Sequence, residues 1–121
     1  MPEDYTNLVT ALKALTKGED EGLIRLPMAE NEWYTRPDDV SYGTVQLEFE
    51  AGALHGDDIK CATAYEGSVD LFSLVKGGAG WIELITRTLT EHCDGAWSLN
   101  SFQYERETGL FHWEWVFQIE G

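Results

Sequence analysis

The chain has 121 residues, a length that fits one domain with a buried core. Hydrophobic residues make up 43% of it and aromatic residues 12%, a composition typical of a globular protein and not of a disordered one. Its 22 acidic and 8 basic residues give a formal net charge of −14, which disfavours binding to nucleic-acid phosphates or to an anionic membrane.

The first residues, MPEDYTN, contain neither the basic nor the apolar region of a secretory signal. The apolar runs are too short for a membrane span. Cys61 and Cys93 do not form a CxxC motif, so we expect both thiols to be reduced and buried. The cytoplasm is therefore the expected compartment.

Residues 3–17 are predicted to form an amphipathic helix. The helix is stabilised by charges that oppose its dipole: acidic residues in the first turn, and Lys13 and Lys17 in the last turn. Gly18 is expected to end the helix. The apolar residues at helical spacing are Tyr5, Leu8, Val9, Leu12 and Leu15.

The next segment, residues 19–39, has no clear period and contains two acidic clusters, with a short strand expected near residues 26–34. Residues 41–51, SYGTVQLEFEA, alternate between apolar and polar side chains, which predicts a half-buried strand. Residues 52–58, GALHGDD, have the composition of a turn.

A long strand is predicted over residues 59–73, with Gly67 as the candidate position of a bulge. The glycines of KGGAG, residues 76–80, interrupt the chain before a second helix over residues 79–92. Asp94 and Gly95 are expected to close that helix. Its apolar stripe consists of Trp81, Ile82, Ile85 and Leu89.

Two strands are predicted at the end of the chain, over residues 97–105 and 110–120. In the first of them the apolar residues change phase, which predicts a bulge near Asn100. In the last strand the apolar residues alternate strictly, which favours a core face over a ligand platform. They are Phe111, Trp113, Trp115, Phe117 and Ile119.

These elements predict a single α+β domain over residues 1–121. We expect an antiparallel or mixed sheet of about four to five strands, with two helices packed on one face. The predicted order is α-β-β-β-α-β-β.

The sequence contains no recognised catalytic motif. KGGAG lacks the following Lys and Ser/Thr of a phosphate-binding loop, and there is no GxSxG. His92 and Cys93 are adjacent near a helix end, where neighbouring residues do not face each other. We therefore expect no enzymatic activity and no cofactor. A small hydrolase is kept as a further hypothesis, ranked below the two structural and inhibitory functions described below.

The most metal-like cluster is formed by His55, Asp57 and Asp58, because hard cations prefer oxygen ligands. No second ligand group can be assigned to it, so no metal site is predicted. His112 lies on the polar face of the last strand and is expected to be a surface or interface histidine. Assembly with other chains is the function that these surfaces favour.

The order of the elements resembles that of the tail-terminator, or tail-completion, proteins of phages with long non-contractile tails, the minor tail protein U-like family. The resemblance covers nearly the whole chain in pattern and order. The chain differs from many members of that family in its acidic segment, residues 18–26, and in the stretch KGGAGWIELI. The stretches that carry it are YTNLVTALKAL, EWYTRP (32–37), SYGTVQLEFEA, ALHGDD, YEGSVDLFS (65–73), the strand containing Trp97 and the closing FQIE.

The resemblance implies a structural role in the virion tail, with assembly in the host cytoplasm and no membrane association. Family members form a ring, typically a hexamer, that closes the end of the tail tube. The ring contacts the tail tube protein on one side and the head–tail connector protein on the other. DNA passes through the ring without specific binding, and an acidic lumen would let it slide.

A closed head-to-tail ring needs two different patches on each subunit. Trp33→Ala is predicted to weaken the ring while the monomer stays folded. The alternative function is an acidic DNA mimic that inhibits a host DNA-binding protein, although the carboxylates are scattered along the sequence. The candidate interface residues are Trp33, Tyr34, His55, Asp57, Asp58, His112 and Glu114.

Overall fold

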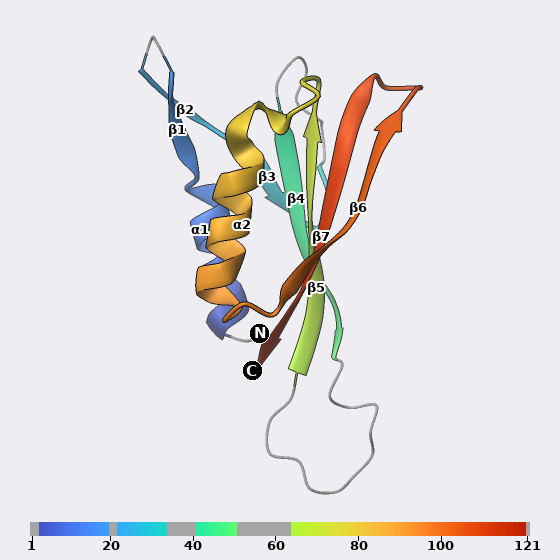
Figure 1. The fold of residues 1–121 in the computed structure, drawn as a ribbon. Coiled ribbons are helices and arrows are strands. Elements are labelled where there is room, and N and C mark those ends of the chain that lie inside the picture. The colour runs from blue at the N-terminus through green and yellow to red at the C-terminus, as the bar shows by residue number, and fades with distance from the viewer. Residues whose placement is uncertain (1–2, 20–21, 34–40, 51–63, 121) are drawn as a thin grey trace, which may run out of the picture.

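The computed structural model describes residues 3–19, 22–33, 41–50 and 64–120. Figure 1 shows two helices side by side against one face of an elongated, twisted sheet. The elements, in chain order, are α1 (Glu3–Lys13), β1 (Thr16–Glu19), β2 (Gly22–Arg25), β3 (Met28–Glu30), β4 (Tyr42–Glu50), β5 (Ala64–Ser73), the 3-10 turn η2 (Gly78–Gly80), α2 (Trp81–His92), β6 (Trp97–Glu105) and β7 (Leu110–Glu120). The predicted α+β class is confirmed.

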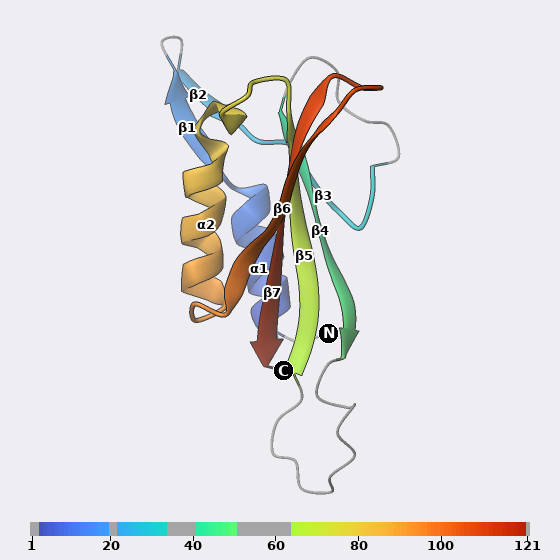
Figure 2. The ribbon, with the colours of Figure 1, turned by 45° about the vertical axis from the view of Figure 1, so that its right-hand side comes forward.

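The main sheet has five strands in the order β3-β4-β5-β7-β6. β3 runs parallel to β4, and the other neighbours are antiparallel, so the sheet is mixed. β1 and β2 form a separate antiparallel hairpin that extends beyond α1 (Figures 1 and 2). This hairpin was not predicted. With its two strands, the number of strands is higher than the four to five that were expected.

The core lies between the helices and the sheet, as the alternation in the last strand predicts. Trp113, Trp115, Phe117 and Ile119 of β7 are all buried on the helix side. Tyr5 of α1 stacks on Phe117 with ring centroids 6.5 Å apart. The aromatic cluster at the C-terminus is therefore mostly core.

Helix α1 ends at Lys13, earlier than predicted, because the chain turns to start the hairpin. Thr16 pairs with Arg25, and the backbone N–H of Leu26 donates to the Leu15 carbonyl at 3.2 Å. Gly18 is part of β1 and does not end the helix. The prediction extended the helix to Leu15 because this residue fits the helical period of apolar side chains. Leu15 does pack against the core, but it lies after the end of the helix.

The bulge expected at Gly67 occurs in the partner strand. The pairing shifts between Leu47 and Phe49 of β4, opposite Glu66 and Gly67. Gly67 itself is needed for close packing: a Cβ there would lie 2.5 Å from Cζ of Phe117. Residues 59–63, the predicted start of this strand, lie outside the described residues.

The second helix follows a left-handed turn in which Gly78, Ala79 and Gly80 have φ values of 75°, 55° and 85°. It starts at Trp81, two residues later than predicted. Asp94 and Gly95, with φ of 51° and 81°, follow its end as expected. The bulge predicted near Asn100 is confirmed by the register shift between Leu99 and Ser101. Neither described helix is long and apolar enough to cross a membrane.

Candidate functional site

The sheet face away from the helices carries a shallow cleft of about 520 Å³, here called the outer-face cleft. Strands β4, β5, β6 and β7 and the segment after β3 all contribute side chains to it. Its lining includes the carboxylates of Glu32, Asp70, Glu105 and Glu114, the rings of Trp33, Tyr42 and Phe72, and His112. This lining makes the cleft strongly negative, so it attracts cations and repels phosphates.

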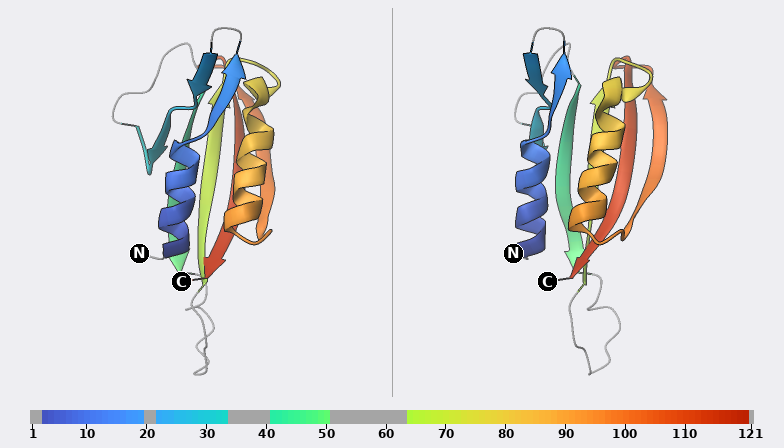
Figure 3. Two further views of the ribbon diagram at one scale, coloured as in Figure 1. Left: turned by 90° about the vertical axis from the view of Figure 1, so that its left-hand side faces the viewer. Right: turned by 60° about the vertical axis from the view of Figure 1, so that its left-hand side comes forward.

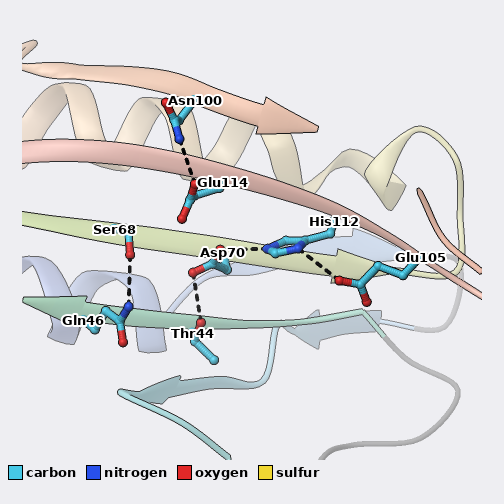
Figure 4. Close-up of polar contacts among 8 residues, drawn as sticks. All are labelled: Thr44, Gln46, Ser68, Asp70, Asn100, Glu105, His112 and Glu114. Atoms are coloured by element: carbon cyan, nitrogen blue, oxygen red, sulfur yellow. Dashed lines mark hydrogen bonds and ion pairs between the residues drawn. The ribbon is translucent and has the colours of Figure 1, made fainter. Parts of the chain in front are cut away.

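His112 stands at the centre of the polar contacts in the cleft (Figure 4). Its Nε2 lies 2.7 Å from Oδ1 of Asp70, and its Nδ1 lies 3.3 Å from Oε2 of Glu105. The Nδ1 contact does not have hydrogen-bond geometry. Burial lowers the pKa of His112, but the hydrogen bond and charge of Asp70 and the charge of Glu105 outweigh it, so the pKa is raised above 6.5.

The His112 ring also ends a row of aromatic contacts across three strands. It stacks on Phe72 at 4.2 Å between ring centroids, and Phe72 stacks on Tyr42 at 5.0 Å. Trp33 meets Tyr42 edge-on at 6.1 Å. The indole Nε1 of Trp33 donates to the Gly43 carbonyl at 3.0 Å. These ring contacts hold the side chains of the cleft wall in place and form a small aromatic cluster on the outer face of the sheet.

The contacts in the cleft favour a structural role for the His112–Asp70 pair. A catalytic dyad would present a nucleophile to the histidine. Here the Thr44 hydroxyl donates to Oδ2 of Asp70, at 3.4 Å, and not to His112. Glu114 accepts a hydrogen bond from Nδ2 of Asn100 at 2.9 Å, which links β7 to β6. The pairs therefore act as cross-strand ties.

A second surface lies on β6, the edge strand of the main sheet next to β7. Leu99, Phe102 and Tyr104, here called the β6 patch, are 49%, 49% and 52% exposed. Phe102 and Tyr104 pair in register with Trp113 and Phe111, so they project on the helix side of the sheet. The Phe102 ring lies 5.0 Å from that of Trp113. The patch is thus an exposed extension of the core.

A third surface is the β1–β2 hairpin, on the opposite flank of the helices from β6 (Figure 3). All four residues of β2 are exposed, with Leu23 at 75% and Ile24 at 41%. Leu23 and Arg25 project from one face of this hairpin and Ile24 from the other, because successive side chains of a strand alternate. We call the face with Leu23 and Arg25 the hairpin surface. The hairpin is anchored on its other strand, where Lys17 donates to the Ala79 carbonyl and lies 5.2 Å from the Trp81 ring centroid.

Three of the predicted site residues line the outer-face cleft together: Trp33, His112 and Glu114. Trp33 is partly buried and contacts Gly43 and Tyr42, and its place in a subunit interface stays a prediction. Tyr34, His55, Asp57 and Asp58 lie outside the described residues. In the part of the chain that is described, no group of three or more His, Cys, Asp or Glu side chains could hold a metal ion.

Sequence reasoning missed Asp70 and Glu105, the partners of His112. Asp70 lies between the apolar Val69 and Leu71, at the same parity of the strand as Glu66 and Ser68, and this alternation was the available signal. It also missed the hairpin surface and the β6 patch. For the patch, the signal was the change of phase between Leu99 and Phe102.

No protein-family model and no curated protein matches this sequence.

Proposed function

We propose that the chain is a structural subunit that assembles with copies of itself into a ring, and that this ring closes the tail tube of a phage and meets the head–tail connector. The observation that carries the proposal is that two of the exposed apolar surfaces of the subunit, the hairpin surface and the β6 patch, lie on opposite flanks of the helices. A closed ring built head to tail needs two such surfaces, because each subunit contacts a different neighbour with each.

Both surfaces have the composition of a contact between proteins. The β6 patch places two half-exposed aromatic rings on an edge strand, and aromatic residues are enriched in protein interfaces. The hairpin surface exposes Leu23, at 75%, on a strand that no other described strand covers, and Ile24 is exposed on the opposite face of the same strand. Grouped apolar residues at the surface mark interaction sites more often than isolated ones do.

The charge of the chain supports the tail role over a role in binding nucleic acid. A ring with a formal charge of −14 on each subunit would present DNA with a repelling lumen, through which the duplex could move with little retention. The same charge opposes direct binding of DNA to an isolated subunit.

The DNA-mimic alternative needs carboxylates that stand free along one face. Several carboxylates of the outer-face cleft are instead engaged within the chain. Asp70 and Glu105 contact His112, and Glu114 accepts from Asn100. This engagement favours assembly as the function.

Molar mass in solution tests the proposal, measured by light scattering after size exclusion at two protein concentrations, with and without magnesium. We expect particles of about six subunits, seen as rings in negative stain. Leu23→Asp should give a monomer, because it places a charge on the hairpin surface. The matched control Asn7→Asp adds the same charge on the exposed side of α1 and should leave the ring intact.

A strict monomer under every condition would count against self-assembly. Displacement of DNA from a host DNA-binding protein, in an electrophoretic competition assay, would then support the DNA-mimic alternative instead.

A further inference from the structure

Glu105 holds the turn between β6 and β7 against the sheet through both oxygens of its carboxylate. Its Oε2 lies 3.3 Å from Nδ1 of His112, and its Oε1 accepts a hydrogen bond from the Thr108 hydroxyl at 3.2 Å. The Gly109 N–H closes the turn by donating to the Glu105 carbonyl at 2.8 Å. Glu105 is also the last residue of β6, so one side chain connects the end of an edge strand, the turn and β7.

The two ring nitrogens of His112 face two carboxylates from different strands (Figure 4). Nε2 lies 2.7 Å from Oδ1 of Asp70 on β5, and Nδ1 faces Glu105 on β6. A carboxylate only accepts, so each contact is favourable only when the nitrogen carries a proton. The imidazolium has a proton on both nitrogens, whereas the neutral ring has one proton for two acceptors. Neutral His112 can therefore satisfy one of the two carboxylates and not the other.

The geometry decides which contact the neutral ring keeps. The Nε2 contact with Asp70 is the shorter one and has hydrogen-bond geometry, whereas the Nδ1 contact with Glu105 does not. Asp70 is also held by its other oxygen, to which the Thr44 hydroxyl donates at 3.4 Å. The single proton of the neutral ring is therefore favoured on Nε2. This leaves the lone pair of Nδ1 directed at the carboxylate of Glu105.

This mismatch is relieved only by a movement. Nδ1 of His112 is buried, so water does not reach it in the closed arrangement. Phe72 stacks on the ring at 4.2 Å between centroids, which holds its orientation, and a ring flip would still leave one proton for two carboxylates. Asp70 lies in the central strand of the sheet, whereas residues 106–108 of the turn are exposed. The turn is therefore the part that moves.

The other charged groups around His112 act in the same direction as its two partners. Glu32, from the segment after β3, and Glu114 on β7 also line the cleft and favour the charged ring. Among the described residues, β4 and the rest of β6 add no charged side chain to the lining. Arg106 is exposed in the turn and does not line the cleft, so water screens its charge. The surplus of negative charge agrees with the raised pKa of His112.

We propose that His112 is a pH-sensitive switch for the β6–β7 turn: the ring protonated on both nitrogens holds Glu105 and keeps the turn closed, and loss of the Nδ1 proton releases Glu105 while the Asp70 contact remains. The release occurs as pH rises through the folded-state pKa of His112, above about 6.5. Tyr104 of the β6 patch directly precedes Glu105, so the same proton sets the order of that end of the patch. The switch works within one subunit and does not depend on the proposed ring.

Two measurements on the full chain test the switch. Nitrogen-15 NMR of histidine-labelled protein, assigned with His112→Gln, reports which ring nitrogen carries the proton at each pH. We expect the neutral ring to carry it on Nε2. Hydrogen–deuterium exchange, corrected for the intrinsic effect of pH, reports opening of the turn. Protection of residues 103–110 should fall about ten-fold between about pH 6 and about pH 9, and that of residues 66–72 should fall by less.

Glu105→Gln is the variant that separates the switch from a merely structural contact. Its side-chain amide can donate to the lone pair of Nδ1 in the neutral ring, so the turn should stay protected as pH rises. Glu107→Gln is the matched control: it removes the same charge from an exposed position of the same turn and should keep the wild-type dependence on pH.

Three results would overturn the switch. They are a neutral His112 ring protonated on Nδ1, a wild-type turn whose protection does not change with pH, and an equal loss of protection in Glu105→Gln and in the wild type. None of them bears on the proposed ring, because the mass in solution is measured separately. A chain that stays monomeric would remove the ring and leave the switch standing.

Discussion

His112 on β7 and Asp70 on β5 are joined by a contact of 2.7 Å between Nε2 and Oδ1, on the sheet face away from the helices. The two residues are diagonal neighbours, since Asp70 pairs in register with Glu114 and Phe72 pairs with His112. Both side chains are largely shielded from water, being 18% and 13% exposed. The contact therefore ties the central strand β5 to its neighbour β7 on the outer face and couples the stability of the pair to the charge of His112.

This coupling predicts that stability depends on pH above about 6.5, the ordinary pKa of histidine. The pKa of His112 is raised in the folded chain, so its contribution to stability is fully present below the unfolded-state pKa and is lost as pH rises through the folded-state pKa. We expect the free energy of unfolding of the wild type to fall over this window relative to His112→Gln. Urea denaturation at a series of pH values measures the difference.

The same series on Asp70→Asn is the control. Asparagine keeps the size of the side chain but removes the charge that holds the pKa of His112 high. The pH dependence should therefore shrink in Asp70→Asn as well. A difference from the wild type that stays constant with pH would show that His112 does not titrate through this pair.

Gly67 should tolerate no side chain. A Cβ there would lie 2.5 Å from Cζ of Phe117 and would also collide with the Gln46 carbonyl. We expect Gly67→Ala to lower the free energy of unfolding by about 3 kcal/mol, because a rigid ring and backbone must both move. Gly77→Ala is the matched control: its Cβ meets nothing within 4 Å and its φ is −89°, so stability should be unchanged or rise by about 0.5 kcal/mol. Equal effects at the two sites would contradict this account.

The parts of the fold that the sequence predicted are those where one local period decides the structure. The strict alternation of Trp113, Trp115 and Phe117 identified a core strand, and the helical stripe of Trp81, Ile85 and Leu89 identified α2. The β1–β2 hairpin had no such period, because TKGE and GLIR bury almost nothing and so need no alternation. Its presence depends on where the chain must turn back after α1, which is a tertiary constraint.

The candidate site was harder to predict than the fold. His112 and Asp70 are 42 residues apart, and only the register of β5 against β7 brings them together. The sequence correctly placed His112 on the polar face but could not supply its partners. The β6 patch depends similarly on the edge position of β6, since the same aromatic residues on a central strand would be covered.

Trp33 offers a test of whether the outer-face cleft takes part in assembly. Trp33→Phe keeps an aromatic ring beside Tyr42 but removes the donor to the Gly43 carbonyl, which should cost about 1 kcal/mol of folding stability. Trp33→Ala removes the ring as well and should cost more, while the core beneath keeps the monomer folded. If the cleft lies in the ring contact, Trp33→Ala should also lower the mass in solution at a concentration where Trp33→Phe still assembles. Equal assembly by both variants would confine Trp33 to a structural role.

Cys93 should react only when the chain unfolds. Its side chain is 5% exposed, and burial, together with the nearby charge of Asp4, raises its pKa to about 12. The thiolate is the reactive form, so at pH 8 we expect iodoacetamide to modify native Cys93 at least about 100-fold more slowly than the urea-unfolded chain. The Cys61→Ser variant isolates this thiol. Labelling of the native protein at the unfolded rate would show that the thiol is reachable in the fold.

Salt should promote assembly if apolar side chains carry the ring contact. Each subunit has a formal charge of −14, so copies repel one another, and raising the ionic strength from about 0.02 to 0.3 M shortens the screening length well below that of dilute buffer. The burial of Leu23 and Phe102 is not weakened by this screening. We therefore expect the concentration needed for assembly to fall several-fold over this range. A series in sodium chloride, matched to magnesium chloride at equal ionic strength, separates screening from a specific effect of the divalent ion. A ring that dissociated as salt rose would instead indicate that ion pairs are the main contact between subunits.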